Sequence, residues 1–213
     1  MTRIQIIPGD FTLPANHPKF DFWVGEGVWA SDTFSEDGLL MGARTDTQLG
    51  GYPATWEGHD DGGWVKEGGR IRSTSTAVAG FKAGGADYVS SAEVAEMPTS
   101  SSSLVLSNRR ATLAFSASLT FYVECRIIAT GGINLVYREP NGAVITVGTA
   151  PTGAVQIGDT VALSTVGTTA TVSVNGTEVI TGTVPVTDAG YAAIRNTGGA
   201  AAGGFTSYKI TVA

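Results

Sequence analysis

The sequence has a single cysteine, Cys125, in a chain of 213 residues. One cysteine cannot form an internal disulfide, so the fold does not depend on an oxidising compartment. Cys125 lies in the apolar run 121–128, where a cysteine is usually a small buried side chain rather than a reactive thiol. The chain also has only two histidines, His17 and His59, so the clustered His and Cys ligands of a transition-metal site are missing.

Charge is also scarce, because charged residues make up 15% of the chain and the net charge is −6. An acidic surface repels a phosphate backbone, so we expect no nucleic-acid partner. No apolar run approaches the roughly 18 residues of a membrane span. Residues 1–8 lack the apolar core and cleavage site of a secretion signal, so we expect synthesis in the cytoplasm.

Helical signals are missing as well, since no stretch of a dozen residues combines helical periodicity with capping residues. Glycine is abundant instead, with 29 residues, and threonine, serine, valine and alanine dominate the remainder. This composition is typical of many short strands joined by tight turns. The length suits one all-β domain.

The clearest strand pattern lies in residues 159–212. Residues 160–165 alternate along the chain, with Val161, Leu163 and Thr165 on one face, and residues 169–174 alternate in the same way. Asn175-Gly176 follows directly and predicts a tight hairpin, because both residue types tolerate positive φ. A sheet of this kind must bury one face against a second sheet, which the earlier residues have to supply.

Further strands are expected at 86–94, 112–116, 119–129, 133–138 and 143–147. The total of roughly eleven to thirteen short strands exceeds that of an immunoglobulin-like domain. We therefore predict an all-β fold over residues 28–213, a two-sheet antiparallel β-sandwich of jelly-roll type.

Residues 1–27 form a separate, proline-punctuated and aromatic-rich arm. Spaced prolines favour extended backbone, and an extended apolar arm is not stable alone in water. The arm packs across its own sandwich, docks on a neighbouring subunit or remains a disordered tail. The side chains expected to make the docking contacts are Phe11, Phe20, Phe22 and Trp23.

Motifs in both halves of the sandwich resemble known families. In the C-terminal half, Asp159-x-Val161-x-Leu163, Val174-Asn-Gly176, Gly190-Tyr191 and the last strand from Phe205 resemble the concanavalin A-like lectin/glucanase and laminin-G sandwiches. The N-terminal half is similar to a module of minor tail proteins from phages that infect actinobacteria. The motifs that carry this second likeness are Ser31-Asp-Thr-Phe34, Gly38, Gly42-Ala-Arg44-Thr-Asp46, Leu49-Gly-Gly51, Trp56 and Gly68-Gly69-Arg-Ile71.

The resemblance implies a non-enzymatic virion structural protein on the surface of a phage particle, in a fold that often binds carbohydrate. Its partners would be other virion subunits, including copies of itself, and a glycan of the host surface. A minor tail protein is the leading expectation. A capsid decoration protein and a free carbohydrate-binding module are the alternatives.

Catalytic residues are not expected. The Glu-x-Asp-x-x-Glu pattern of the related glucanases is absent, and Glu124 is isolated in the sequence. Glu93 and Glu96 are three residues apart, so a strand places them on opposite faces. Neither histidine lies in the context of a catalytic triad.

A saccharide site requires an aromatic platform with polar neighbours. The densest such set is Tyr52, Trp56, His59, Asp60, Asp61 and Trp64, although the two tryptophans fit a buried core equally well. No cofactor is expected, but calcium would suit Asp60 and Asp61 with Asp32, Asp37 or Asp46, unless these carboxylates are simply solvated. Arg109-Arg110 is interpreted as a solvated turn.

Overall fold

The computed structural model describes most of the chain from Val28 onward. The described residues are 28–40, 42–43, 45–48, 55–59, 63–73, 75–83, 85–113, 121–139, 142–186, 190–198 and 203–213. The arm 1–27, with its four candidate docking aromatics, lies outside them. No segment of the described ranges is a helix that could cross a membrane.

Two antiparallel sheets account for the fold. The ten-stranded sheet has the order β15-β14-β13-β8-β17-β6-β5-β2, with β1 paired to β17 and β3. Its strands are β1 (Val28–Asp32), β2 (Gly38–Leu39), β3 (Thr47–Gln48), β5 (Trp64–Lys66), β6 (Ile71–Ser73), β8 (Tyr88–Glu96), β13 (Thr160–Val166), β14 (Thr169–Val174), β15 (Thr177–Thr183) and β17 (Gly204–Val212).

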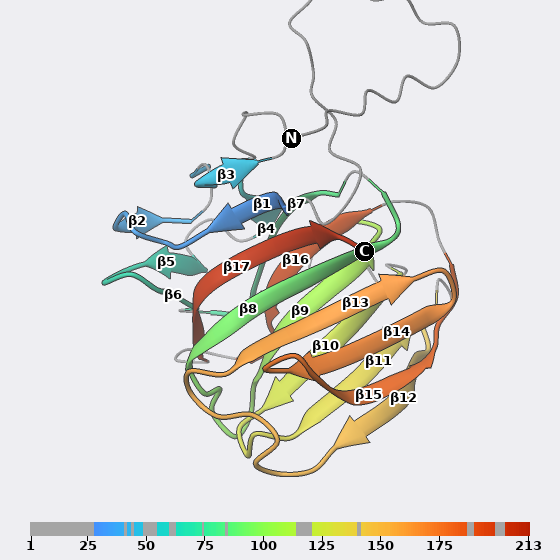
Figure 1. The fold of residues 1–213 in the computed structure, drawn as a ribbon. Helices are drawn as coiled ribbons and strands as arrows, with labels where there is room; N and C mark the ends of the chain where they lie inside the picture. The colour runs from blue at the N-terminus through green and yellow to red at the C-terminus, as the bar shows by residue number, and fades with distance from the viewer. Residues whose placement is uncertain are drawn as a thin grey trace, which may run out of the picture.

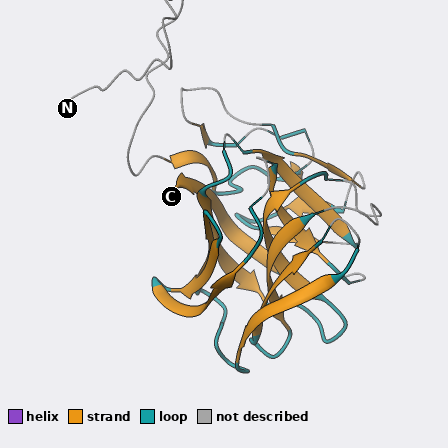
Figure 2. Ribbon diagram, turned by 90° about the vertical axis from the view of Figure 1, so that its right-hand side faces the viewer, coloured by secondary structure: helices purple, strands orange, loops and turns teal. Residues whose placement is uncertain are grey.

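The seven-stranded sheet has the order β12-β11-β10-β9-β16-β7-β4. Its strands are β4 (Glu57–His59), β7 (Ala77–Lys82), β9 (Ser103–Arg110), β10 (Tyr122–Ile128), β11 (Ile133–Arg138), β12 (Val144–Ala150) and β16 (Tyr191–Asn196). The two sheets are stacked, with β8, β13 and β14 in front of β9, β10 and β11 in Figure 1. The side view in Figure 2 shows strands and loops, with no helix among the described residues. The predicted two-sheet jelly-roll sandwich is confirmed.

The strands β13 and β14 have the predicted alternation of buried and outward-facing side chains. Val161, Leu163 and Thr165 are fully buried on the face of β13 that meets the other sheet. Asn175 and Gly176 form the turn between β14 and β15, and both have positive φ, 50° and 78°. Local alternation and turn chemistry therefore set this part of the fold.

The number of strands was underestimated, since the described residues contain seventeen. The excess lies in β2 to β6, which are two or three residues long. A strand of two or three residues is too short to show the alternation of apolar and polar side chains, so the sequence pattern cannot reveal it. Their pairing is set by the neighbours, for example by β17, which pairs with β6 at Gly204 and Phe205.

The edge strands β12 and β15 approach each other and close one side of the sandwich. A Cβ atom placed on Gly148 of β12 would lie 2.6 Å from Cγ2 of Ile180 on β15. A Cβ atom on Gly182 of β15 would likewise collide with Val147. The two glycines therefore permit this close approach, because any larger residue would push the strands apart.

Aromatic side chains fill the other end of the core. The Trp56 ring centroid lies 5.1 Å from that of Phe81, 5.4 Å from that of Tyr208 and 6.2 Å from that of Phe34. All four side chains are buried. These contacts join β7 of the seven-stranded sheet to β17 of the ten-stranded sheet.

Candidate functional site

The outer face of the seven-stranded sheet carries a cluster of charged side chains. Along β10, Val123, Cys125 and Ile127 point into the core. Tyr122, Glu124 and Arg126 alternate with them and therefore lie on the opposite face. This outer face is the candidate functional site.

Glu124 lies at the centre of the cluster and its side chain has no solvent-exposed surface. Its carboxylate lies 2.8 Å from Nε of Arg126, 3.0 Å from Nη1 of Arg195 and 3.4 Å from Nη1 of Arg110. The three arginines come from β10, β16 and β9, which are adjacent in the sheet. The sheet order thus brings them onto one carboxylate. We call Glu124, Arg110, Arg126, Arg195 and Tyr122 the arginine cluster.

The ring of Tyr122 supports all three guanidinium groups. Their Cζ atoms lie 5.5 Å (Arg110), 5.8 Å (Arg126) and 6.0 Å (Arg195) from its centroid. Nη2 of Arg126 also donates a 2.9 Å hydrogen bond to the Tyr122 hydroxyl. Cation–π contact and ion pairing together fix the orientation of the cluster before any ligand arrives.

The pKa values of the arginines show how burial and neighbouring charges act on this cluster. The pKa of Arg110 is lowered to about 10, mainly by burial and also by the nearby charges of Arg195 and Arg138, while Glu124 opposes the change. Burial also disfavours the charged form of Arg126, but Glu124 and Tyr122 outweigh this effect and raise its pKa. The arginines therefore repel one another, and Glu124 is the carboxylate that holds them together.

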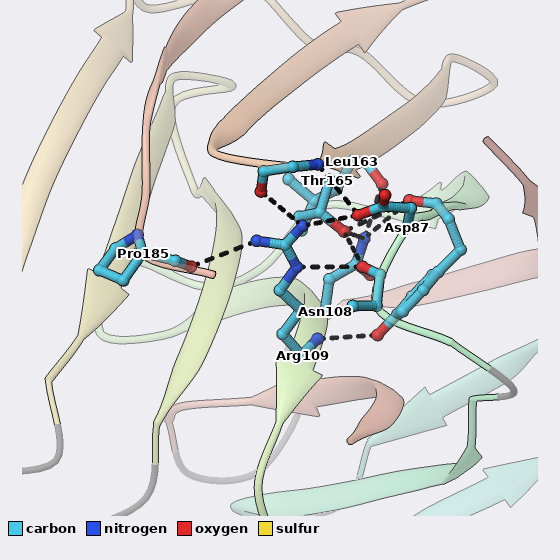
Figure 3. A network of polar contacts seen from close by, with 9 residues as sticks. Asp87, Asn108, Arg109, Leu163, Thr165 and Pro185 are labelled. Carbon is cyan, nitrogen blue, oxygen red and sulfur yellow. Dashed lines mark hydrogen bonds and ion pairs between the residues drawn. The ribbon is translucent and has the colours of Figure 1, made fainter. Parts of the chain in front are cut away.

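A second polar network joins the two sheets and has a structural role (Figure 3). The backbone of Arg109 has a positive φ of 50°. Its guanidinium donates to the carbonyl oxygens of Ala86, Gly167 and Pro185 and to the Asp87 carboxylate. Its neighbour Asn108 donates to the Leu163 carbonyl at 2.9 Å. These bonds tie β9 to the ends of β8 and β13.

The aromatic platform expected around Trp56 and Trp64 is not formed by these two residues. Both tryptophan side chains have no exposed surface, so neither can stack on a sugar, and the core interpretation is correct. His59 lies at the end of β4, but its side chain is outside the described part of the chain. Tyr52, Asp60 and Asp61 also lie outside it.

The candidate calcium ligands that are described already accept hydrogen bonds. Asp32 accepts from the Trp56 indole, Asp37 from the Gly68 amide and Asp46 from Thr33. Within the described ranges no three His, Cys, Asp or Glu side chains are grouped as a metal site. Since Asp60 and Asp61 lie outside those ranges, calcium binding stays a prediction.

The interpretation of Arg109-Arg110 was wrong, and the role of Glu124 was missed. Arg109 and Arg110 are buried in β9 and do not form a solvated turn. Glu124, isolated in the sequence, is the most heavily paired carboxylate of the outer face. The alternation of β10 could have indicated this role. A glutamate flanked by the core residues Val123 and Cys125 must lie on the opposite face of the sheet. If that face is covered, the buried carboxylate requires cationic partners.

The acidic residues of this sheet are too far apart for the two-carboxylate chemistry of glycosidases. Within its strands the acidic side chains are Glu57 on β4 and Glu124 on β10. Four strand spacings separate β4 from β10, which is about 19 Å, whereas glycosidase carboxylates lie ~5 to 9.5 Å apart. The strands of this sheet therefore supply no catalytic pair.

No protein-family model and no curated protein sequence matches the chain. Solved structures do match. The carbohydrate-binding module CBM66 from Bacillus subtilis has a TM-score of 0.51 at 14% identity, over 73% of this chain and 91% of the module. A β-glucanase from Bacillus licheniformis has a TM-score of 0.57 at 14% identity, over 88% of this chain and 99% of the enzyme.

A third match is the exoplasmic/lumenal domain of VIP36 in its Ca2+- and Man3GlcNAc-bound form. It has a TM-score of 0.52 at 11% identity, over 74% of this chain and 83% of that domain. At these identities the similarity concerns the fold, and the matched proteins include both a binding module and an enzyme. The chain therefore shares a two-sheet β-sandwich fold with these solved structures.

Proposed function

We propose that this chain is a non-enzymatic, carbohydrate-binding structural protein of a phage particle, a minor tail protein that displays its sandwich to a glycan of the host surface. The observation that carries the binding half of the proposal is the preorganised arginine cluster on the outer face of a lectin-type sheet. Two proteins of this fold, CBM66 and the Man3GlcNAc-bound VIP36 domain, support a saccharide ligand.

The absence of enzymatic activity is part of the proposal. Glu124 is held by three guanidinium groups and its side chain is fully buried, so a substrate does not reach its carboxylate. The other acidic side chain of that sheet's strands, Glu57, is about 19 Å away by strand spacing. A face of this kind supports binding better than hydrolysis.

The phage location rests on the N-terminal motifs, whose residues have structural roles. Asp32 accepts hydrogen bonds from Trp56 and from the Phe34 amide, and Gly68 and Gly69 form the turn between β5 and β6 with φ of 62° and 74°. Because these motif residues stabilise the sandwich itself, the same sandwich can serve as a module in a larger assembly such as a phage particle. Many copies on one particle would turn weak glycan contacts into firm attachment.

Localisation of the chain on intact particles tests the virion half. An antibody against the sandwich, viewed by electron microscopy, should label the tail. Label on the head would replace the tail assignment with capsid decoration, and absence from purified particles would leave a free carbohydrate-binding module.

Oligomerisation tests the arm. Light scattering on the full chain should show an assembly larger than one subunit, and removal of residues 1–27 should reduce it to the monomer. A full-length monomer would contradict subunit docking through Phe11, Phe20, Phe22 and Trp23 and favour packing of the arm on its own sandwich.

A further inference from the structure

The arginine cluster has an unusual balance of charge for an acidic protein. The chain carries a net charge of −6, yet three guanidinium groups meet one carboxylate at this place. Each of the three contacts the same Glu124 and the same Tyr122 ring, so the positive charge is concentrated within a few ångströms. Buried or partly buried charges of one sign are costly to bring together, and an arriving anion offsets part of that cost.

Arg126 is the member of the cluster best placed to meet a ligand. Its side chain is 24% exposed, against 14% for Arg195 and 2% for Arg110. Its Nε donates to Glu124 and its Nη2 to Tyr122, which leaves Nη1 without a hydrogen bond to any described residue. The two bonds that it makes hold the plane of the guanidinium in place, so Nη1 is a fixed donor.

A polar neighbour lies beside Arg126 on the same face. Asn134 on β11 is the register partner of Arg126, and cross-strand partners share a face of the sheet. Ile133 and Leu135 on either side of it point into the core, so the half-buried Asn134 points outward. An amide next to a fixed guanidinium can bind a sugar hydroxyl beside the charged group of the same residue.

From this arrangement we infer that the ligand of the outer face is an acidic saccharide, whose carboxylate or sulfate group binds Nη1 of Arg126 with Arg195 alongside. The inference rests on the proposed glycan-binding function and specifies its ligand class. A planar guanidinium matches the oxygens of either anion, whereas a neutral sugar cannot form an ion pair with it. The overall negative charge of the protein repels polyanions elsewhere, so binding depends on this cluster.

The test is a glycan array carrying neutral, uronate-containing, sialylated and sulfated glycans, with titrations of oligogalacturonate against its methyl ester and of dextran sulfate against dextran. The full chain should bind the charged member of at least one pair more tightly. Arg126→Gln should weaken that binding by about tenfold or more, which corresponds to ~1.4 kcal/mol, and Arg126→Lys should retain part of it. The two pairs distinguish a carboxylate ligand from a sulfate ligand.

Arg72→Gln is the matched control, because Arg72 lies on the ten-stranded sheet, is 40% exposed and pairs loosely with Glu67 at 3.8 Å. It removes the same charge and should leave binding unchanged. Thermal unfolding of each variant separates loss of the ligand from loss of the fold. Equal weakening by Arg72→Gln and Arg126→Gln would overturn the inference by showing a diffuse charge effect.

Two further outcomes separate this inference from the proposed function. Binding of neutral glycans only, unchanged in a folded Arg126→Gln variant, would overturn the acidic ligand and leave glycan binding intact. Failure to bind any glycan on the array, with a folded protein, would overturn both.

Discussion

The indole Nε1–H of Trp56 donates a 2.7 Å hydrogen bond to Oδ2 of Asp32, and both side chains are buried. The other carboxylate oxygen of Asp32 accepts the amide of Phe34 at 2.8 Å. This carboxylate thus satisfies two buried donors where β1 leads into the aromatic end of the core. Its location shows that Trp56, a candidate for the sugar platform, instead helps to hold the sandwich together.

Removal of this carboxylate should therefore destabilise the fold. Asp32→Ala leaves the Trp56 indole and the Phe34 amide without an acceptor, which should lower the free energy of unfolding by about 2 to 3 kcal/mol. Urea denaturation followed by tryptophan fluorescence measures this. Asp37→Ala is the control, since Asp37 is exposed and accepts a single bond from Gly68. If both variants lost the same free energy of unfolding, the greater loss expected for the buried Asp32 would be contradicted.

Asp32 should also make stability depend on pH. Burial raises its pKa, Asp46 adds to this, and the bonds from Trp56 and Phe34 offset part of it. The folded state therefore holds this proton more tightly than the unfolded state. Its contribution is present below the unfolded pKa of about 3.9 and is lost as the pH rises through the folded pKa, by ~1.4 kcal/mol per unit of difference.

The comparison with Asp32→Asn isolates this effect. The wild-type free energy of unfolding should fall relative to that of the asparagine variant between about pH 4 and neutrality. Denaturant titrations of both proteins across this range provide the measurement. A difference that stays constant, or that grows in favour of the wild type as the pH rises, would show that Asp32 is not protonated more readily in the fold.

The Arg109 network predicts unequal effects for the two members of one ion pair. Arg109→Met removes the buried donor of the charge-assisted bonds to the carbonyl oxygens of Ala86, Gly167 and Pro185 and should cost about 3 kcal/mol. Asp87→Asn should cost less than ~1 kcal/mol, since the Asp87 side chain is 51% exposed. Chemical denaturation of both variants tests this, and a larger loss for Asp87→Asn would reverse the assignment.

Glu124 should be the most sensitive charged residue of the outer face. Glu124→Gln retains the size of the side chain but leaves Arg110, Arg126 and Arg195 without their shared carboxylate, which should destabilise the fold by about 3 to 5 kcal/mol. A double variant, Glu124→Gln with Arg110→Met, removes one of the repelling charges and should recover part of the loss. Strictly additive losses would show that the two residues are not coupled.

The thiol of Cys125 should react only when the protein unfolds. Burial, together with the nearby charge of Glu124, raises its pKa to about 12, so very little thiolate forms at neutral pH. The side chain also has no exposed surface, which confirms the expected buried cysteine. A thiol reagent should label the protein fully in urea and negligibly in native buffer. Rapid labelling of the native protein would contradict this placement.

The features that were predictable from the sequence depend on residues that are close together along the chain. The strand at 133–138 has the predicted bounds, and the turn at Asn175-Gly176 has the predicted backbone conformation. Alternation fixes which side chains of a strand share a face, and turn residues fix where the chain reverses. Short strands escaped prediction because two or three residues contain too little alternation.

The candidate site escaped prediction for a different reason. Glu124 meets Arg110 fourteen residues away and Arg195 seventy-one residues away. The strand order β10-β9-β16 produces this meeting, and β16 enters the sheet after six intervening strands. A sequence shows these charges as isolated residues, so the solvated-turn interpretation of Arg109 and Arg110 was reasonable and wrong.

The sequence by itself determined that this chain is a two-layer antiparallel sandwich, since alternation and turn chemistry act over a few residues. Only the tertiary structure decided that Trp56 and Trp64 fill the core and that three arginines converge on Glu124. Burial and charge pairing between strands depend on which strands become neighbours. That order is set by the packing of the whole chain, not by any local pattern.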